Sequence, residues 1–250
     1  MNRSPISLLA LLLCLTACAG YEGVVQEALQ VAQTAVVPNA SESVSATREA
    51  LEKGIKTGVA DLQKSGGFSQ SAYRILLPKD LQKAADLGRS LGLQPQIDSF
   101  EASLNRAAEQ AVGAAVPVFQ DSLKKMTFQD IVGILQGSDQ AATQYFQRTS
   151  QEQLLATFKP IVAKATEAND VGKLYKQIAS TVKPAAALTG LAVPAVDLDQ
   201  YVSEQAVKAL FEEIGKQEQL IRKNPAERTT ALLQKVFGYY SQSAQKNAGH

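Results

Sequence analysis

Acidic and amide side chains recur at a helical spacing between residues 98 and 109. Four of them are three or four positions apart, which places them on one face of an α-helix: Asp98, Glu101, Asn105 and Glu109. Arg106 is adjacent to this face. Two carboxylates held close together could act as general acid and base, as glycan hydrolysis requires. The alternative is a solvated helix face with Asn105 bonded to a neighbouring helix, and this interpretation is favoured because charged helix faces are common.

A second polar cluster lies at the expected junction of the last two helices and consists of Arg222, Asn224, Arg228 and Thr229. The first turn of a helix presents free N–H groups and the positive end of its dipole to an anion. Arginine adds fork-shaped donors that match carboxylate and phosphate groups. The cluster is therefore a candidate anion site. The favoured alternative is that Asn224 caps the helix and an arginine pairs with Glu218 or Glu227.

Six candidate binding residues follow from these two clusters: Asn105, Arg106, Glu109, Arg222, Arg228 and Thr229. They would form one site if the fold brought them to the same concavity. The turn at residues 137–143 could also hold a phosphate at a helix start, but it lacks the lysine and glycine spacing of a P-loop. Close packing of its small residues is favoured. Tyr239 and Tyr240 are expected to anchor at an interface.

Several catalytic and metal-binding arrangements are excluded by residue types that the chain lacks. The single histidine is His250, and the two cysteines are Cys14 and Cys18. Zinc sites built from histidine and cysteine, and nucleophilic sites that pair serine or cysteine with histidine, are therefore excluded. The sequence predicts no catalytic residue, no metal ligand and no cofactor.

The first 18 residues have the pattern of an export signal that ends at a cysteine. Arg3 precedes an apolar run at residues 6–15, which is shorter than the ~20 residues needed to span a bilayer. The end of the signal, residues 15–18 (LTAC), resembles a bacterial lipobox. The resemblance implies cleavage of residues 1–17 and acylation of Cys18. Ala17-Cys18-Ala19 is also an A-x-A-like site, so release of a soluble periplasmic protein by cleavage after Ala19 is the alternative.

The expected partner of this anchor is a membrane. Each buried methylene contributes ~0.8 kcal/mol, so several acyl chains bind firmly. Ala19 stands where Gram-negative lipoproteins carry their usual inner-membrane retention signal, an aspartate, and its presence implies the outer membrane, facing the periplasm. The mature chain carries 24 basic and 24 acidic side chains, because Arg3 is the only charged residue in the signal. No nucleic-acid partner is expected from this balance.

The apolar spacing predicts an all-α fold, an irregular bundle of about nine to eleven short and medium helices without significant sheet. A lipidated N-terminus and tether (residues 18–42) precede a single helical domain (43–238) and a flexible tail (239–250). Segment 184–196 is rich in alanine and proline and reads as a linker or lid. The predicted helices span about 43–64, 78–91, 95–115, 127–135, 139–149, 150–168, 170–183, 197–223 and 224–238, with interruptions at Pro117 and Pro160.

Four stretches resemble one family: residues 105–109 (NRAAE), 137–146 (GSDQAATQYF), 201–211 (YVSEQAVKALF) and 221–238 (IRKNPAERTTALLQKVFG). Gly67-Phe68 and Leu77-Pro78 agree as well. The resemblance is to the bacterial domain-of-unknown-function family 4197, whose members are exported and mostly helical, and it covers about residues 45–238. It implies a fold and a compartment, and it supplies no mechanism.

Three functions remain open. The favoured one is a lipid-anchored, non-enzymatic binding module of the cell envelope, with an envelope protein or a small ligand as its partner. The second is a carrier of an apolar molecule or lipid, with segment 184–196 as a lid. The third is a carboxylate-dependent glycan hydrolase that uses Glu109 with Glu101 or Asp98.

Overall fold

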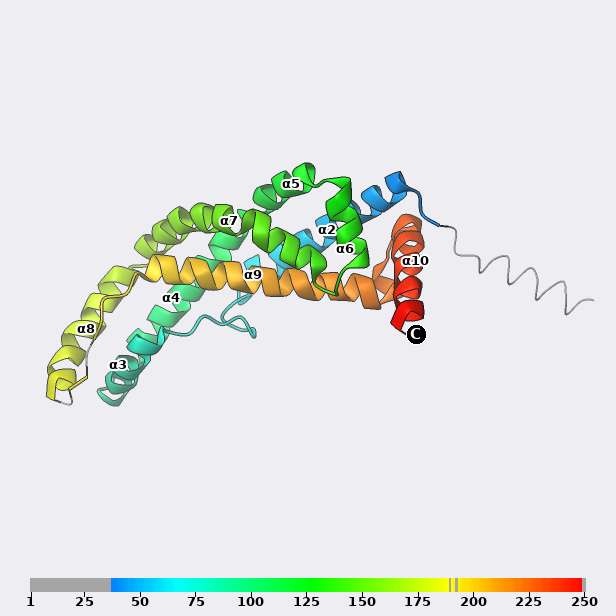
Figure 1. Ribbon diagram of the computed structural model, residues 1–250. Helices are drawn as coiled ribbons and strands as arrows, with labels where there is room; N and C mark the ends of the chain where they lie inside the picture. The colour runs from blue at the N-terminus through cyan, green and yellow to red at the C-terminus, as the bar shows by residue number, and fades with distance from the viewer. Residues whose placement is uncertain (1–36, 189, 192, 249–250) are drawn as a thin grey trace, which may run out of the picture. The chain divides into compact units, whose positions relative to one another are not determined.

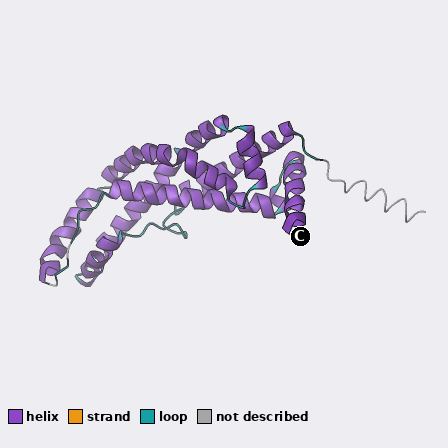
Figure 2. Cartoon of the chain, in the orientation of Figure 1, coloured by secondary structure: helices purple, strands orange, loops and turns teal. Residues whose placement is uncertain are grey.

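The computed structural model describes residues 37–188, 190–191 and 193–248 of the 250-residue chain. The predicted signal peptide, Cys18 and most of the predicted tether lie outside these residues. Within them every regular element is a helix (Figure 2), which confirms the all-α fold. None of these helices is long and apolar enough to cross a membrane.

Several helices of the described chain are longer than the sequence pattern predicts. The helix bounds are α2 (Ala40–Gln63), α3 (Lys79–Ser90), α4 (Gln94–Val112), α5 (Ala115–Lys125), α6 (Phe128–Gln136), α7 (Ala141–Ala168), α8 (Val171–Leu188), α9 (Leu198–Lys223), the short 3-10 helix η1 (Pro225–Glu227) and α10 (Ala231–Ala248).

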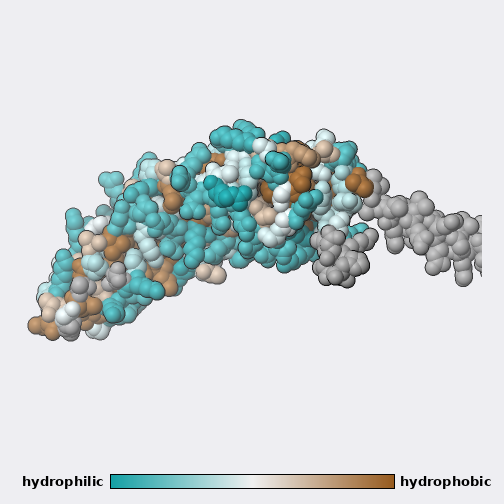
Figure 3. Space-filling view, viewed as in Figure 1, coloured by the Kyte–Doolittle hydropathy of each residue, from teal (hydrophilic) through white to brown (hydrophobic). Residues whose placement is uncertain are grey.

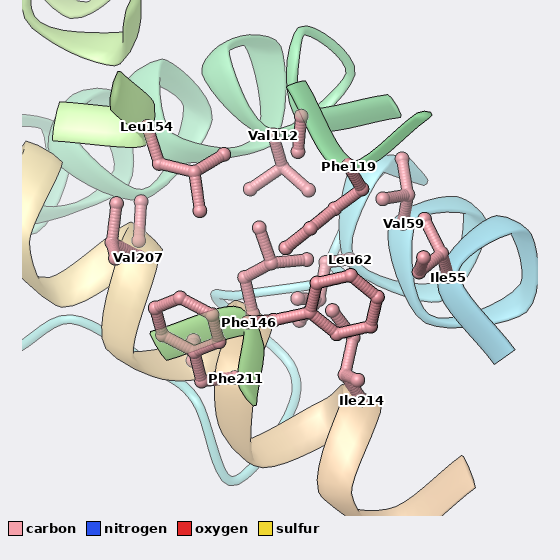
Figure 4. Packing of buried hydrophobic residues seen from close by; sticks show 14 of the residues in the cluster. Ile55, Val59, Leu62, Val112, Phe119, Phe146, Leu154, Val207, Phe211 and Ile214 are labelled. Atoms are coloured by element: carbon pink, nitrogen blue, oxygen red, sulfur yellow. The ribbon is translucent and has the colours of Figure 1, made fainter. Parts of the chain in front are cut away.

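The core forms around α9, which packs against α2, α4 and α7, and Figure 1 shows α7 and α9 side by side. Three phenylalanines meet at its centre (Figure 4). The ring of Phe119 lies edge-on to Phe146 at 5.1 Å and to Phe211 at 6.2 Å between centroids, a geometry that aromatic rings prefer. The main buried cluster of the described residues extends from Ala46 to Phe237, so a fragment that begins at residue 37 contains all of it.

Two of the predicted helix starts are confirmed in atomic detail. The Thr127 hydroxyl accepts a hydrogen bond from the Asp130 amide at 3.2 Å, and the Asp130 carboxylate accepts from the Thr127 amide at 2.9 Å. Asp197 accepts from the amide of Gln200 at 2.9 Å and begins α9. Side-chain caps of this kind satisfy N–H groups that the first turn leaves free.

These caps predict a loss of stability in acid. Hydrogen bonds from Thr127 lower the pKa of Asp130, and the backbone bond from Gln200 lowers the pKa of Asp197. A carboxylate with a lowered folded-state pKa stabilises the protein above its unfolded pKa, and the contribution is lost as pH falls through the folded pKa. The free energy of unfolding in urea should therefore fall less between pH 6 and pH 3 in the double variant Asp130→Asn/Asp197→Asn than in wild type. The prediction is contradicted if this free energy falls equally in both proteins, or if the control variant Asp98→Asn shows the same smaller fall as the double variant.

The predicted break between residues 149 and 150 and the interruption at Pro160 are wrong, because α7 is one continuous helix. Its apolar stripe passes through both positions, with Leu154 and Phe158 fully buried. Pro160 lacks the backbone N–H that would donate to the carbonyl four residues earlier. The missing hydrogen bond bends the helix but does not end it when neighbouring helices pack against the residues on both sides of the proline. Figure 1 shows α7 curving along its length.

Pro117 lies inside the first turn of α5, so the helix break at this point falls at Gly113 and Ala114 instead. A proline in a first turn removes no intrahelical hydrogen bond. The prediction of a linker or lid at 184–196 is also wrong in part. Helix α8 continues through Pro184 to Leu188 because Ala186 is buried against a neighbouring helix.

The last helix begins and ends later than predicted. Asn224 does act as a cap, accepting from the Ala226 amide at 3.1 Å, but the helix it starts is the single turn η1. Helix α10 begins after Thr230, whose hydroxyl accepts from the Leu233 amide at 3.2 Å. It passes Gly238 and ends at Ala248, so residues 239–248 are helical, whereas the sequence pattern predicts that the last helix ends at Gly238.

Candidate anion-binding groove

The connector (residues 64–78) joins α2 to α3 without regular structure and is held by side chains of α4. The amide group of Asn105 accepts from the Ile75 N–H at 2.8 Å and donates to the Ile75 carbonyl at 2.9 Å. It also donates to the carbonyl of Glu101 at 2.8 Å. Asn105 therefore pairs with an extended backbone as a neighbouring strand would, and it is buried, with 1% of its surface exposed.

The carboxylates of the same helix face are also bound within the fold. One oxygen of Glu109 accepts from the backbone amides of Gly66 at 3.1 Å and Phe68 at 3.3 Å. Glu101 forms ion pairs with Arg74 at 2.8 Å and Arg89 at 2.7 Å. Through these bonds the two buried carboxylates position the connector, and each has at least one oxygen bound within the fold.

Helix α9 holds the connector from a second side through residues that the sequence reasoning missed as site residues. The Tyr73 hydroxyl donates to Glu213 at 2.7 Å, and the Tyr201 hydroxyl donates to the Leu76 carbonyl at 2.8 Å. Burial raises the pKa of Tyr73 above its ordinary value. Lys216 lies 4.4 Å from the centroid of the Tyr73 ring. The connector is thus fixed between α4 and α9.

The start of α7 already has an anion, and it is a side chain of the protein. The two oxygens of Glu218 accept from the amides of Ala142 at 3.0 Å and Thr143 at 2.9 Å. Arg222 pairs with the same carboxylate at 2.9 Å and donates to the Ile134 carbonyl at 2.6 Å. The amides of the turn at residues 137–143 therefore bind the carboxylate of Glu218, at the place where the sequence allows a phosphate. The expected arginine–glutamate ion pair forms between Arg222 and Glu218.

Arg228 differs from Arg222, because it is a buried cation with no carboxylate within ion-pair distance among the described residues. Its Nε donates to the Ile221 carbonyl at 3.0 Å. One terminal nitrogen, Nη2, donates to the Arg222 carbonyl at 2.6 Å and the Ser241 hydroxyl at 3.0 Å. Burial lowers the pKa of the guanidinium, although arginine stays protonated in proteins. The other terminal nitrogen, Nη1, has no hydrogen-bond acceptor in the described chain.

An open groove of about 920 Å³ lies beside Arg228, between the α6–α7 turn, the end of α9 and α10. Three cations and one acid line it, and the acid, Asp139, is paired with Lys223 at 2.6 Å. Arg222 is neutralised by Glu218. The uncompensated charge of the groove is therefore that of Arg228. Its other lining residues are Leu135, Gln136, Gly137, Pro225, Phe237, Gly238, Tyr239, Tyr240, Ser241, Gln242 and Ser243.

The six predicted binding residues separate into distinct places. Asn105 and Glu109 hold the connector, whereas Arg222 and Arg228 line the groove. No hydrogen bond or ion pair of the described chain joins one group to the other. Arg106 and Thr229 are exposed and contribute no side-chain bond to either group.

The groove wall formed by α10 was missed because the helix was expected to end at Gly238. Val236, Phe237 and Tyr240 keep the three- and four-residue spacing of one helix face. That spacing was the available signal that α10 continues. Tyr239 and Tyr240 are half-buried, with their rings perpendicular and 5.3 Å apart, so they form part of the groove wall.

Comparison with known proteins gives a family and no relative of known activity. No curated protein and no solved structure matches the chain. Residues 38–238 match the family described as "Protein of unknown function (DUF4197)", and this range contains the connector, the pair Glu218–Arg222 and Arg228. The chain therefore belongs to the DUF4197 family.

Proposed function

We propose that the protein is a non-enzymatic binding module of the cell envelope, and that the groove beside Arg228 holds an anionic ligand. The observation that carries this proposal is that Arg228, a residue with only 6% of its surface exposed, has a terminal nitrogen, Nη1, without an acceptor in the described chain. A buried charge without a counter-charge is unfavourable. A carboxylate or phosphate in the groove would supply that counter-charge and accept the unused N–H groups.

The envelope location rests on the sequence of the export signal. Residues 15–18 resemble a lipobox, and acylation of Cys18 would place the domain on the periplasmic face of the outer membrane. Cleavage after Ala19 would give a soluble periplasmic protein instead. Labelling of the expressed chain with a radioactive or alkyne-tagged fatty acid, with Cys18→Ala as control, distinguishes the two forms.

The carrier and hydrolase functions have less support. The apolar pocket between α3, α4 and α8 holds about 30 Å³, and the one beside Ile214 and Phe237 holds about 20 Å³. Each is close to the size of a single water molecule. Glu101 and Glu109 are bound by arginines and backbone amides. The small pockets do not favour an apolar cargo, and the bound carboxylates do not favour an acid–base pair.

Gly238 allows a test that leaves the bonds of Arg228 in place. A Cβ added at this position would lie 3.9 Å from Arg228 Nη1, which is ordinary contact. The carboxylate of Gly238→Asp can therefore neutralise the guanidinium, whereas Gly238→Asn has the same shape without charge. We expect Gly238→Asp to weaken binding of inorganic phosphate at least tenfold and Gly238→Asn to change it less than threefold.

The measurement is the rise in melting temperature of residues 37–250 with phosphate, compared with chloride at equal ionic strength. Native mass spectrometry of the mature protein, purified gently from its envelope, would then show the natural ligand as an added mass. Equal phosphate responses in the aspartate and asparagine variants would overturn the assignment of the groove.

A further inference from the structure

Leucine side chains are exposed where α3 and α8 end together. Leu188, at the last position of α8, is 90% exposed, and Leu91, just after α3, is 46% exposed. Leu93 and Leu191 follow them and are half-buried. These four leucines are named the apolar end. Figure 1 shows α3 and α8 ending on the same side of the domain, and Figure 3 shows hydrophobic residues gathered there.

The two most exposed leucines, Leu91 and Leu188, are not part of the buried cluster between α3 and α8. A small cluster of Ala84, Val182 and Ala186 joins α3 to α8, and Leu93 and Leu191 pack against it. Leu91 and Leu188 project beyond this cluster. The sequence from Pro184 to Val196 contains no charged residue. An uncharged segment with outward leucines is typical of a surface that meets an apolar phase.

A stripe of lysines runs along α8 behind the apolar end. Helix α8 contains Lys173, Lys176 and Lys183 and no acidic residue. Their separations of three and seven positions place them on one helix face. All three are exposed, and no carboxylate whose side chain the structure describes lies within ion-pair distance of them.

Helix α3, which packs against α8, is also more basic than acidic. In α3, Lys79 and Lys83 are exposed and form no ion pair with any carboxylate whose side chain the structure describes, and Asp86 is paired with Arg89 at 2.9 Å. The other acid of α3 is Asp80, so α3 carries three basic residues and two acids. Together α3 and α8 carry six basic residues against two acids, although the mature chain as a whole is balanced.

We propose that this end of the domain binds an anionic lipid surface, with Leu188 and Leu91 entering the interface and the lysines of α8 and α3 facing the headgroups. Basic residues beside shallowly inserted leucines are the combination that gives reversible membrane binding. The contact is independent of acylation at Cys18 and of the groove beside Arg228.

The test is co-sedimentation of residues 37–250 with two kinds of vesicle at 50 mM salt. One is pure phosphatidylcholine, and the other contains about 30% phosphatidylglycerol. We expect binding to the anionic vesicles only, and its loss at 0.5 M salt. Leu188→Asp should lower binding at least fivefold, and the exposed Leu220→Asp on α9 is the matched control that should not.

A second pair of variants, which have the same net charge as each other, tests the lysine stripe. Replacing Lys173, Lys176 and Lys183 together with glutamine should lower binding at least tenfold, because each basic residue contributes about fivefold. Replacing the exposed lysines 56, 124 and 208 with glutamine removes the same charge elsewhere and should have a smaller effect. Equal losses in the two triple variants, insensitivity to Leu188→Asp, or no binding to anionic vesicles would each overturn the proposal.

Discussion

Replacing Glu218 with alanine is expected to lower the free energy of unfolding by about 3 kcal/mol, because the change leaves a mostly buried arginine without its partner. The side chains of Glu218 and Arg222 are only 6% and 12% exposed. The same change frees the amides of Ala142 and Thr143 at the start of α7. Buried donors without acceptors are unfavourable in the folded state.

Chemical denaturation of wild type and variant measures this effect. Arg222→Ala should also destabilise, and the double variant should be less destabilised than the sum of the two, because the residues interact directly. Glu212→Ala is the control, since Glu212 is about half exposed and pairs weakly with Lys208 at 3.9 Å. A loss below about 1 kcal/mol for Glu218→Ala would mean that solvent replaces its bonds at little cost.

Replacing Asn105 with alanine is expected to lower the free energy of unfolding by about 2–4 kcal/mol. Both the N–H and the carbonyl of Ile75 lose their partner, and each buried unpaired group costs ~1–3 kcal/mol. Asn105→Asp should also destabilise, because a carboxylate accepts from the N–H but cannot donate to the carbonyl.

Hydrogen exchange at the Ile75 amide separates a local effect from a global one. In wild type this amide should exchange slowly, and in Asn105→Ala it should exchange much faster than the core of α9. Gln110→Ala, an exposed amide on the same helix, should change neither stability nor exchange. Unchanged protection at Ile75 in Asn105→Ala would show that the connector is held without this side chain.

The two predictions assign the most strongly bonded polar residues to the framework. Glu218 fills the anion site at the start of α7, and Asn105 fixes the connector against α4. In the groove beside Arg228, by contrast, a charge lacks an ion-pair partner among the described residues, and this groove is the proposed ligand site. The proposed ligand site of this chain therefore lies at the α9–α10 junction and not on the acidic face of α4.

The helical class and several helix starts can be predicted from the amino-acid sequence alone. Thr127 with Asp130, and Asp197 with Gln200, bond across three residues, so both partners are visible in the local sequence. Apolar spacing likewise depends on the geometry of one helix. Lipidation at Cys18 also rests on local sequence and stays a prediction.

The tertiary structure decided which polar groups are used and which are free. Glu218 reaches amides about 75 positions away, and Asn105 reaches the backbone 30 positions away. Spacing along the chain contains no information about such pairs, because their partners come together only when the helices pack. The same packing carries α7 through Pro160 and α10 past Gly238, since burial of a continuous apolar face outweighs a locally unfavourable residue. Glu218 and Arg222 are four positions apart in α9, so their pair is visible in the sequence. The acceptors of Arg228 on α9 and α10, and the groove beside it, form only when these two helices pack together.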